Sequence, residues 1–406
     1  MKLIREAYLQ KIRPYYDTDL IKVITGVRRA GKSILLETIK DELLQRGVDG
    51  EHIIYINLED MDYEFIKTAS DLHNAVKLMI VDSGKYYIFL DEVQHVKDFE
   101  KTLASFRATL NVSVFVTGSN STLLSGELAT LLTGRTVEFE VFPFSFLEAK
   151  AYKELNGYAV SEDDIYDYLK WGGLPLRFNF HDEASVRRYV TNLYDSIINK
   201  DIIKKGRNID KETFKHVSLY ILANAGKEFS AANIVAYFAN KNKKAISERT
   251  IYNYLDKMRK SYLLHTVPRY NIVGKEALKT KEKFYAIDTG FRTINTNSIN
   301  YEDTFFLENI IYNELCVQGF TVYVGKTYKG EIDFVAIKDG KKCFIQVAYL
   351  LTSPATIDRE FGEFKPITDA SPKYVLSLDK IDMSQNGIIH MNIVDFLLHK
   401  KELMVS

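Results

Sequence analysis

Residues 26–33 read GVRRAGKS, in which two glycines enclose four residues and are followed by a lysine and a serine. An apolar run at residues 20–25, typical of a buried parallel strand, precedes this segment, and apolar residues at helical spacing follow it. Glycines let the backbone turn so that its N–H groups face an anion, and the start of a helix adds a positive dipole. The segment therefore predicts a phosphate-binding loop. A glycine-rich turn that binds nothing is the alternative.

Contacts with a nucleotide follow from this pattern. We expect Lys32 to reach the β- and γ-phosphates and Ser33 to ligate Mg²⁺, so that ATP and Mg²⁺ are the expected ligands. The expected nucleotide-binding residues are Gly26, Val27, Arg28, Arg29, Ala30, Gly31, Lys32, Ser33 and Ile34.

Four further strand patterns occur within the first 150 residues, at positions 52–58, 86–92, 112–119 and 136–142. Strands that alternate with helical patterns predict a doubly wound α/β domain, in which ligands bind at the carboxyl ends of the strands. The loop, a pair of carboxylates and a polar cluster all follow strands. We therefore expect them to meet at one edge of the sheet.

The strand at residues 86–92 ends in two carboxylates. We expect Asp91 to hold Mg²⁺, directly or through water, and Glu92 to orient or deprotonate the attacking water. A solvated turn is the alternative for two adjacent acids, but the loop upstream favours the catalytic interpretation. The expected catalytic residues are Glu92, Lys32, Arg135 and Ser119, and the expected Mg²⁺ ligands are Ser33 and Asp91.

Further polar residues support this interpretation. Thr117, Ser119 and Asn120 lie at the end of the strand at residues 112–119, where they would sense the γ-phosphate or position water; a plain turn is the alternative. Arg135 precedes the last strand and is expected to reach the γ-phosphate in a neighbouring subunit, as an arginine finger does. An ordinary surface arginine is the alternative there.

Charge and composition exclude a globally basic nucleic-acid binder. Lys and Arg together number 54 and Asp and Glu also number 54, so the formal net charge is zero. The length of 406 residues predicts two or three domains.

The two cysteines, Cys316 and Cys343, lie in apolar runs and are expected to be free thiols in a reducing compartment. Because the sequence contains neither an apolar signal core nor an 18-residue apolar stretch, we expect a cytoplasmic protein with no membrane partner.

These motifs resemble those of a known group. The chain is similar to AAA+ ATPases, more broadly ASCE-class P-loop ATPases, of the archaeal and bacterial group with a winged helix and a C-terminal nuclease-like domain. The matching segments are residues 26–33, 89–92, 117–119, 132–135, 141–146, 171–175 and 283–290. The resemblance implies an α/β P-loop AAA+ core that hydrolyses ATP. No clear sensor-2 arginine follows Trp171, and Arg177 is the candidate.

The middle of the chain is locally basic. Residues 211–224, 231–238 and 247–261 predict three helices, and residues 262–270 predict a strand, an order typical of a winged helix-turn-helix. Residues 241–283 contain twelve Lys and Arg against four Asp and Glu, a charge that suits the DNA backbone. A winged helix that contacts only protein is the alternative. The expected DNA-binding residues are Arg249, Tyr252, Asn253, Lys257 and Lys260.

A different pattern follows residue 302. A helical carboxylate, Glu308, then an acid on one strand, Asp333, and a polar residue on the next, Gln346, resemble the restriction-endonuclease-like PD-(D/E)xK fold. In that family a second strand acid helps to hold Mg²⁺, and a lysine stabilises the attacking hydroxide. Gln346 replaces that acid and Ala348 replaces the lysine, so little or no nuclease activity is expected. Lys326 or Lys342 would have to supply the missing cation, and zinc is not expected.

The expected domains are a P-loop ATPase core (1–150), a helical lid (151–208), a winged helix (209–290) and a degenerate PD-(D/E)xK-like domain (291–406). Together they predict an ATP-hydrolysing, DNA-binding protein that acts on branched or junction DNA. A homo-oligomer is expected, with a hexameric ring as one candidate form. Two alternatives stay open: a nucleotide-dependent switch that scaffolds protein partners, and a nuclease licensed by ATP.

Overall fold

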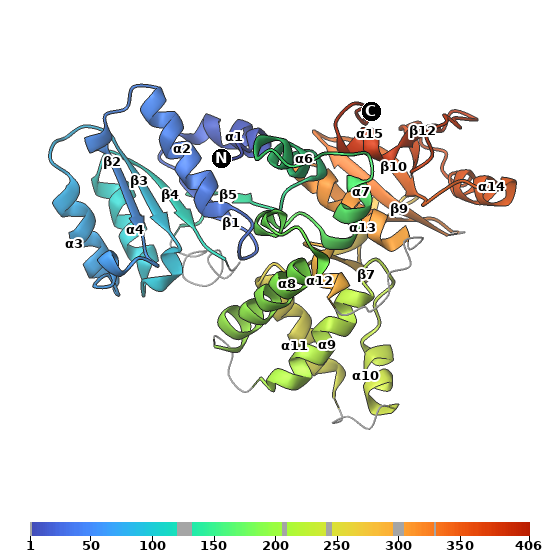
Figure 1. Ribbon diagram of the computed structural model, residues 1–406, viewed down its shortest axis with the longest axis horizontal. Coiled ribbons are helices and arrows are strands. Elements are labelled where there is room, and N and C mark those ends of the chain that lie inside the picture. The colour runs from blue at the N-terminus through green and yellow to red at the C-terminus, as the bar shows by residue number, and fades with distance from the viewer. Residues whose placement is uncertain (1, 120–131, 205–208, 241–245, 295–303, 329) are drawn as a thin grey trace. The chain divides into compact units, whose positions relative to one another are not determined.

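The computed structural model describes residues 2–119, 132–204, 209–240, 246–294, 304–328 and 330–406. The chain folds into two compact units (Figure 1). The first unit comprises Met1–Phe142 and Lys260–Tyr262, and the second comprises Pro143–Arg259 and Leu263–Ser406. None of the described helices combines the length and the apolar character that crossing a membrane requires.

A parallel sheet forms the centre of the first unit. Its strands are β1 (Ile21–Thr25), β2 (Ile53–Asn57), β3 (Tyr86–Asp91), β4 (Val112–Thr117) and β5 (Thr136–Glu140), and its helices are α1 (Glu6–Ile12), α2 (Lys32–Gln45), α3 (Ala69–Met79) and α4 (Phe99–Thr109). The strand order is β2-β3-β4-β1-β5, and every pairing is parallel. All five strands predicted from the sequence are present, and the predicted parallel α/β sheet is confirmed.

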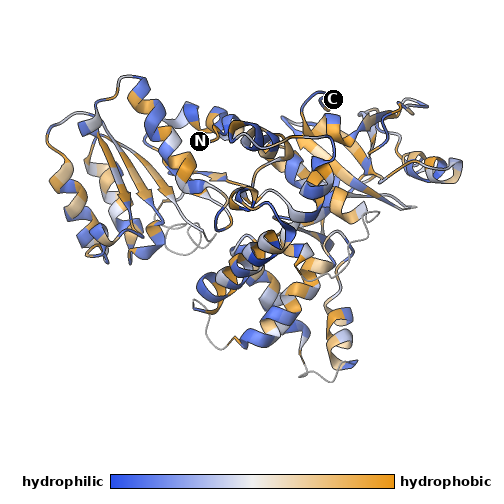
Figure 2. Ribbon diagram, in the orientation of Figure 1, coloured by the Kyte–Doolittle hydropathy of each residue, from blue (hydrophilic) through white to orange (hydrophobic). Residues whose placement is uncertain are grey.

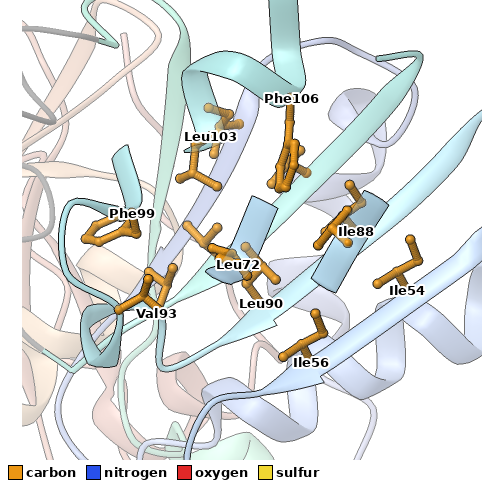
Figure 3. Close-up of a cluster of buried hydrophobic side chains, with 14 of the residues drawn as sticks. Ile54, Ile56, Leu72, Ile88, Leu90, Val93, Phe99, Leu103 and Phe106 are labelled. Atoms are coloured by element: carbon orange, nitrogen blue, oxygen red, sulfur yellow. The ribbon is translucent and has the colours of Figure 1, made fainter. Parts of the chain in front are cut away.

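Helices cover both faces of this sheet. On one face, Ile56 and Leu90 of the sheet pack against Leu72 of α3 and Leu103 and Phe106 of α4 (Figure 3). On the other face α2 packs against β3 and β4. Figure 2 shows the strands as largely apolar, as parallel strands buried on both sides must be.

The ammonium group of Lys22 lies inside this sheet. The residue is 0% exposed and is the second residue of β1, where its Nζ donates hydrogen bonds to Ser113 Oγ at 2.7 Å and to the carbonyl oxygen of Thr18 at 3.2 Å. Burial lowers the pKa of Lys22 to about 7, because the interior solvates the charged form less well than water does.

Lys22→Met should remove a pH dependence of stability. The unfolded lysine keeps a pKa near 10.5 while the folded one titrates near 7, so between these values the unfolded state binds more protons. The free energy of unfolding of the first unit should therefore rise with pH, by about 1 kcal/mol per pH unit. Hydrogen exchange of the β1 amides between pH 7 and 9, corrected for intrinsic rates, measures this rise. An equal pH dependence in wild type and Lys22→Met would contradict it.

The second unit combines helices with a seven-stranded sheet. Its helices are α6 (Phe146–Leu155), α7 (Asp164–Trp171), α8 (Glu183–Ile197), α9 (Lys211–Ala223), α10 (Ala231–Asn240), α11 (Glu248–Lys260), α12 (Gly290–Thr293), α13 (Thr304–Val317), α14 (Pro354–Gly362) and α15 (Ile393–Leu397). Its strands are β6 (Leu264–Asn271), β7 (Glu276–Ala286), β8 (Thr321–Lys326), β9 (Glu331–Lys338), β10 (Lys341–Val347), β11 (Lys373–Ser377) and β12 (Ile389–Asn392).

The three helices and the strand predicted between residues 211 and 270 are present as α9, α10, α11 and β6. Ser230 Oγ accepts a hydrogen bond from the N–H of Asn233, and Ser247 Oγ accepts one from the N–H of Thr250, each at 3.2 Å. Both serines therefore cap their helices.

The hairpin β6–β7 belongs to the same sheet as the C-terminal strands. The strand order is β12-β11-β10-β9-β8-β6-β7. The pairs β6–β7, β8–β9 and β9–β10 are antiparallel, and β6 runs parallel to β8 with Tyr270 opposite Gly325. The segment after α11 and the segment after α13 are therefore joined by main-chain hydrogen bonds.

One buried carboxylate connects α7 to the end of this hairpin. Asp288 accepts hydrogen bonds from the N–H of Gly173 at 2.7 Å and from the N–H of Gly290 at 2.8 Å, and burial raises its pKa to about 6. A Cβ on Gly172 would stand 2.1 Å from the Asp288 carboxylate, and one on Gly173 would stand 1.9 Å from the carbonyl oxygen of Phe144. Glycine is thus required at both positions where α7 ends.

Candidate functional site

The loop between β1 and α2 wraps around a lysine. Gly26 and Gly31 have φ of 135° and 100°, which L side chains rarely adopt. A Cβ on Gly26 would also stand 2.2 Å from the carbonyl oxygen of Val141. Lys32 opens α2, and its Nζ donates hydrogen bonds to the carbonyl oxygens of Gly26 and Val27, each at 3.1 Å. The loop therefore has the tight turn and the helix start that the sequence predicted.

Arg5 supports the loop from the segment before α1. It is 3% exposed, and its Nη1 donates hydrogen bonds to the carbonyl oxygens of Ala30 at 3.0 Å and of Phe142 at 2.9 Å. A guanidinium with several donors can bridge two segments that the chain separates widely. No local pattern marks Arg5 in the sequence, because its partners are main-chain carbonyls far along the chain.

The strand order brings the predicted acids to the loop. Because β4 lies between β3 and β1, Thr117 at the end of β4 stands beside Asp91 at the end of β3. The Thr117 hydroxyl donates to Asp91 Oδ1 and accepts a hydrogen bond from the N–H of Glu92 at 2.9 Å. The Ser33 hydroxyl also lies close enough to the Asp91 carboxylate to act on its pKa. The structure thus brings together the two predicted Mg²⁺ ligands and the neighbouring Glu92.

Burial and hydrogen bonds act on Asp91 in opposite directions. Burial raises the pKa of Asp91, while the Thr117 and Ser33 hydroxyls oppose the rise. Tyr55 of β2 is a further neighbour: burial and then the charge of Asp91 raise the pKa of Tyr55. No sequence pattern identified it. The only feature of the sequence that marks Tyr55 is its position two residues before the end of a strand. That position becomes informative only when the order of the strands in the sheet is known.

Glu92 is held in an unusual backbone conformation. Its φ and ψ are 54° and 49°, in the left-handed region that residues other than glycine and asparagine seldom occupy. The side-chain amide of Gln94 donates a hydrogen bond to Glu92 Oε2. Strained residues of this kind occur preferentially at functional sites, and here the conformation turns the chain directly after the strand that carries Asp91.

The other predicted site residues lie apart from this network. Ser119 is 1% exposed, and its Oγ has no hydrogen-bond partner within the described part of the chain; Asn120 lies outside the described residues. Arg135 is exposed, and its carbonyl oxygen accepts a hydrogen bond from the N–H of Ile21 at 2.9 Å. Arg135 therefore lies at the amino end of β1, the length of the strand away from the loop.

Arg177, the candidate sensor-2 residue, is engaged inside the second unit. It is 3% exposed, with Nε 2.6 Å from the carbonyl oxygen of Gly172 and Nη1 2.8 Å from the carboxylate of Asp167. These contacts hold the guanidinium against the glycines that end α7.

Helix α11 presents one apolar and one polar face. Ile251, Tyr254, Leu255 and Met258 are buried, while four of the predicted DNA-binding residues are exposed and Lys257 is half-buried. The exposed residues are Arg249, Tyr252, Asn253 and Lys260. The ring of Tyr252 also meets the ring of Phe229 edge-on at 6.1 Å. The predicted set therefore lies on the outer surface of its helix.

Two of the three residues expected to resemble a nuclease site, Glu308 and Asp333, are buried. Glu308 lies on α13, Asp333 on β9 and the half-buried Gln346 on β10. Lys283 of β7, which no sequence pattern identified, approaches Glu308 to 3.5 Å. Lys326 and Lys342 were the candidates for the missing lysine, but Lys342 pairs with Asp369 at 2.6 Å and Lys326 is exposed.

Two family models and two related proteins match this chain. A family model described as an AAA domain matches residues 18–150, and one described as a domain of unknown function matches residues 162–298. An uncharacterized protein of Haemophilus influenzae is 35% identical over 399 residues, which are 97% of this chain and 98% of that protein. Uncharacterized protein MJ1544 of Methanocaldococcus jannaschii is 29% identical over 384 residues, 89% and 81% of the two chains.

A solved structure shares the fold. The Walker-type ATPase PABY2304 of Pyrococcus abyssi matches with a TM-score of 0.52 and 15% identity, over 72% of this chain and 95% of that chain. At this identity the likeness concerns the fold alone. The match to an AAA domain over residues 18–150 covers the parallel sheet and the loop of the first unit.

Proposed function

The chain belongs to the family of the Haemophilus influenzae protein and carries an AAA domain, and from this premise we propose that it hydrolyses ATP at the loop of residues 26–33. The observation that carries the proposal is the network in which Ser33, Asp91, Thr117 and Glu92 meet at one edge of the sheet. A loop that only bound a nucleotide would not need two carboxylates held beside it.

Each residue has a separate role in this proposal. Lys32 would exchange the carbonyl oxygens of Gly26 and Val27 for the β- and γ-phosphates of ATP. The N–H groups of the loop and of the start of α2 would face the same phosphates. Glu92 would orient and deprotonate the attacking water, and Ser119 would contact the γ-phosphate.

The residues present fit a magnesium ion. Oxygen ligands suit Mg²⁺, and the Ser33 hydroxyl already lies close enough to the Asp91 carboxylate to oppose the rise of its pKa. When bound, Mg²⁺ neutralises charge on the phosphates. Burial raises the pKa of Asp91 and so disfavours its ionised form. A nearby cation would act in the opposite direction and favour that form.

Arg135 fits a role in a neighbouring subunit. Strands rise about 3.3 Å per residue, so the five residues of β1 separate Arg135 from its own loop by roughly 16 Å. Its exposed side chain therefore suits a phosphate bound by another copy of the chain. We accordingly propose a homo-oligomer, with a hexameric ring as one form.

Lys32→Ala and Glu92→Gln should each lower the rate of ATP hydrolysis by roughly 100-fold or more, since each removes a group that acts on the transition state. Glu92→Gln should still bind ATP, whereas Lys32→Ala should bind it weakly. Phosphate release and binding of a fluorescent ATP analogue measure the two effects.

Lys77→Ala and Glu64→Gln are matched controls, because both side chains are exposed on the same unit. Both controls should hydrolyse ATP like the wild type. Hydrolysis at the wild-type rate in Lys32→Ala or Glu92→Gln would refute the assignment of the site.

DNA is the proposed partner of the second unit. Three helices followed by an antiparallel hairpin support a winged helix, and the exposed side of α11 carries basic and hydrogen-bonding side chains. Basic residues on such a helix suit contacts with phosphates, while Asn253 suits a base edge. Branched or junction DNA is the sharper form of this proposal, and a protein partner bound by the same helix is the competing outcome.

Arg249→Ala and Lys257→Ala should each weaken binding to DNA several-fold and make its salt dependence shallower, by about one unit of the log–log slope for each phosphate that the variant no longer neutralises. Mobility shifts with duplex, fork and four-way junction across a salt series measure both. Lys341→Ala, an exposed lysine of β10, is the control and should bind like the wild type. If the wild type binds none of the three at low salt, the partner is not DNA.

A further inference from the structure

The nuclease-like cluster contains a positive charge of its own. Lys283 reaches it from β7, where its Nζ forms an ion pair with Glu331 of β9 and lies 3.5 Å from Glu308 of α13. The side chains of Lys283 and Glu308 are each 6% exposed. A buried ammonium group so close to two carboxylates is the principal cation of this cluster.

The electrostatic balance of the cluster depends on this lysine. Burial by itself lowers the pKa of Lys283, but the charges of Glu308, Asp333 and Glu331 outweigh that effect and hold the pKa above its ordinary value. Burial raises the pKa of Glu308 to about 7 and also raises that of Asp333, while Lys283 opposes both rises. Each partner thus favours the charged form of the other.

Other groups of the chain also contact one oxygen of each carboxylate. The Tyr285 hydroxyl donates to Glu308 Oε2 at 3.1 Å, and the N–H of Val347 donates to Asp333 Oδ2 at 2.8 Å. Arg269 pairs with Glu331 at 2.8 Å. Each carboxylate therefore has at least one partner from the chain itself.

The cluster does not fit the metal ion that the resemblance implies. Gln346 is neutral, its amide oxygen accepts a hydrogen bond from the N–H of Asp333 at 3.3 Å, and its amide nitrogen donates to Glu360 at 3.1 Å. Nowhere among the described residues do three His, Cys, Asp or Glu side chains gather so that they could hold a metal. Two of the carboxylates, Glu308 and Glu331, face the ammonium group of Lys283.

We propose that Lys283 supplies, as a permanent part of the chain, the positive charge that a divalent metal ion supplies in nucleases of the fold it resembles. The cluster is then a structural ion-pair network that ties the hairpin β6–β7 to α13 and β9, and it takes no metal. This inference rests on the proposed nuclease-like character of the C-terminal segment, and it is independent of ATP hydrolysis and of DNA binding. It also opposes the alternative of an ATP-licensed nuclease.

Lys283→Met tests the proposal, because methionine keeps an unbranched side chain and removes the charge. Loss of one partner of a buried ion pair is strongly destabilising, so the melting temperature should fall by about 10 °C. Mn²⁺ at millimolar concentration should raise the melting temperature of Lys283→Met and leave that of the wild type unchanged relative to EDTA. Lys275→Met, an exposed lysine of the same hairpin, should behave like the wild type.

A second variant keeps the test decisive if Lys283→Met does not fold. Adding Glu308→Gln removes one of the unpaired carboxylates, so the double variant should recover part of the stability and should no longer respond to Mn²⁺. Stabilisation of the wild type by Mn²⁺, a melting temperature of Lys283→Met equal to that of Lys275→Met, or a Lys283→Met protein indifferent to Mn²⁺ would each overturn the proposal. All of these proteins, the wild-type reference included, carry Asp91→Ala in addition, so that Mn²⁺ at the proposed magnesium site of the first unit does not contribute to the shifts.

Discussion

The hydroxyl group of Thr117 holds the nucleotide site together. It donates a hydrogen bond to Asp91 and accepts one from the N–H of Glu92, because β4 pairs with β3. On its other side the main chain of Thr117 pairs with Ile24 of β1, so Thr117 lies between the strand that carries the acids and the strand that leads into the loop. The proposed division of roles between Asp91 and Glu92 depends on this position.

The same principle, a buried polar group that joins distant segments, recurs in both units. Arg5 connects the loop to the end of β5 through two carbonyl oxygens. Asp288 connects the end of α7 to the end of β7 through two main-chain N–H groups. Buried polar groups are costly unless they are paired, so each of these contacts fixes the geometry of the segments that it joins.

Much of the first unit was predictable from the sequence, and less of the second. GVRRAGKS and the run that ends in Asp91 carry short-range patterns, and their structures follow from local periodicity and glycine content. The contacts of Arg5 and Tyr55 were not predictable, because they depend on the order of strands. The role of Lys283 was not predictable for a related reason. Lys283 lies on the hairpin β6–β7, and only the pairing of β6 with β8 places that hairpin in the same sheet as Glu331.

A crystal structure with Mg²⁺ and a non-hydrolysable ATP analogue tests the central claim most directly. The account predicts that Lys32 leaves the carbonyl oxygens of Gly26 and Val27 for the β- and γ-phosphates, that Mg²⁺ lies next to Ser33 and Asp91, and that a water stands between Glu92 and the γ-phosphate. A nucleotide bound elsewhere, or one bound while Lys32 keeps its present hydrogen bonds, would contradict it.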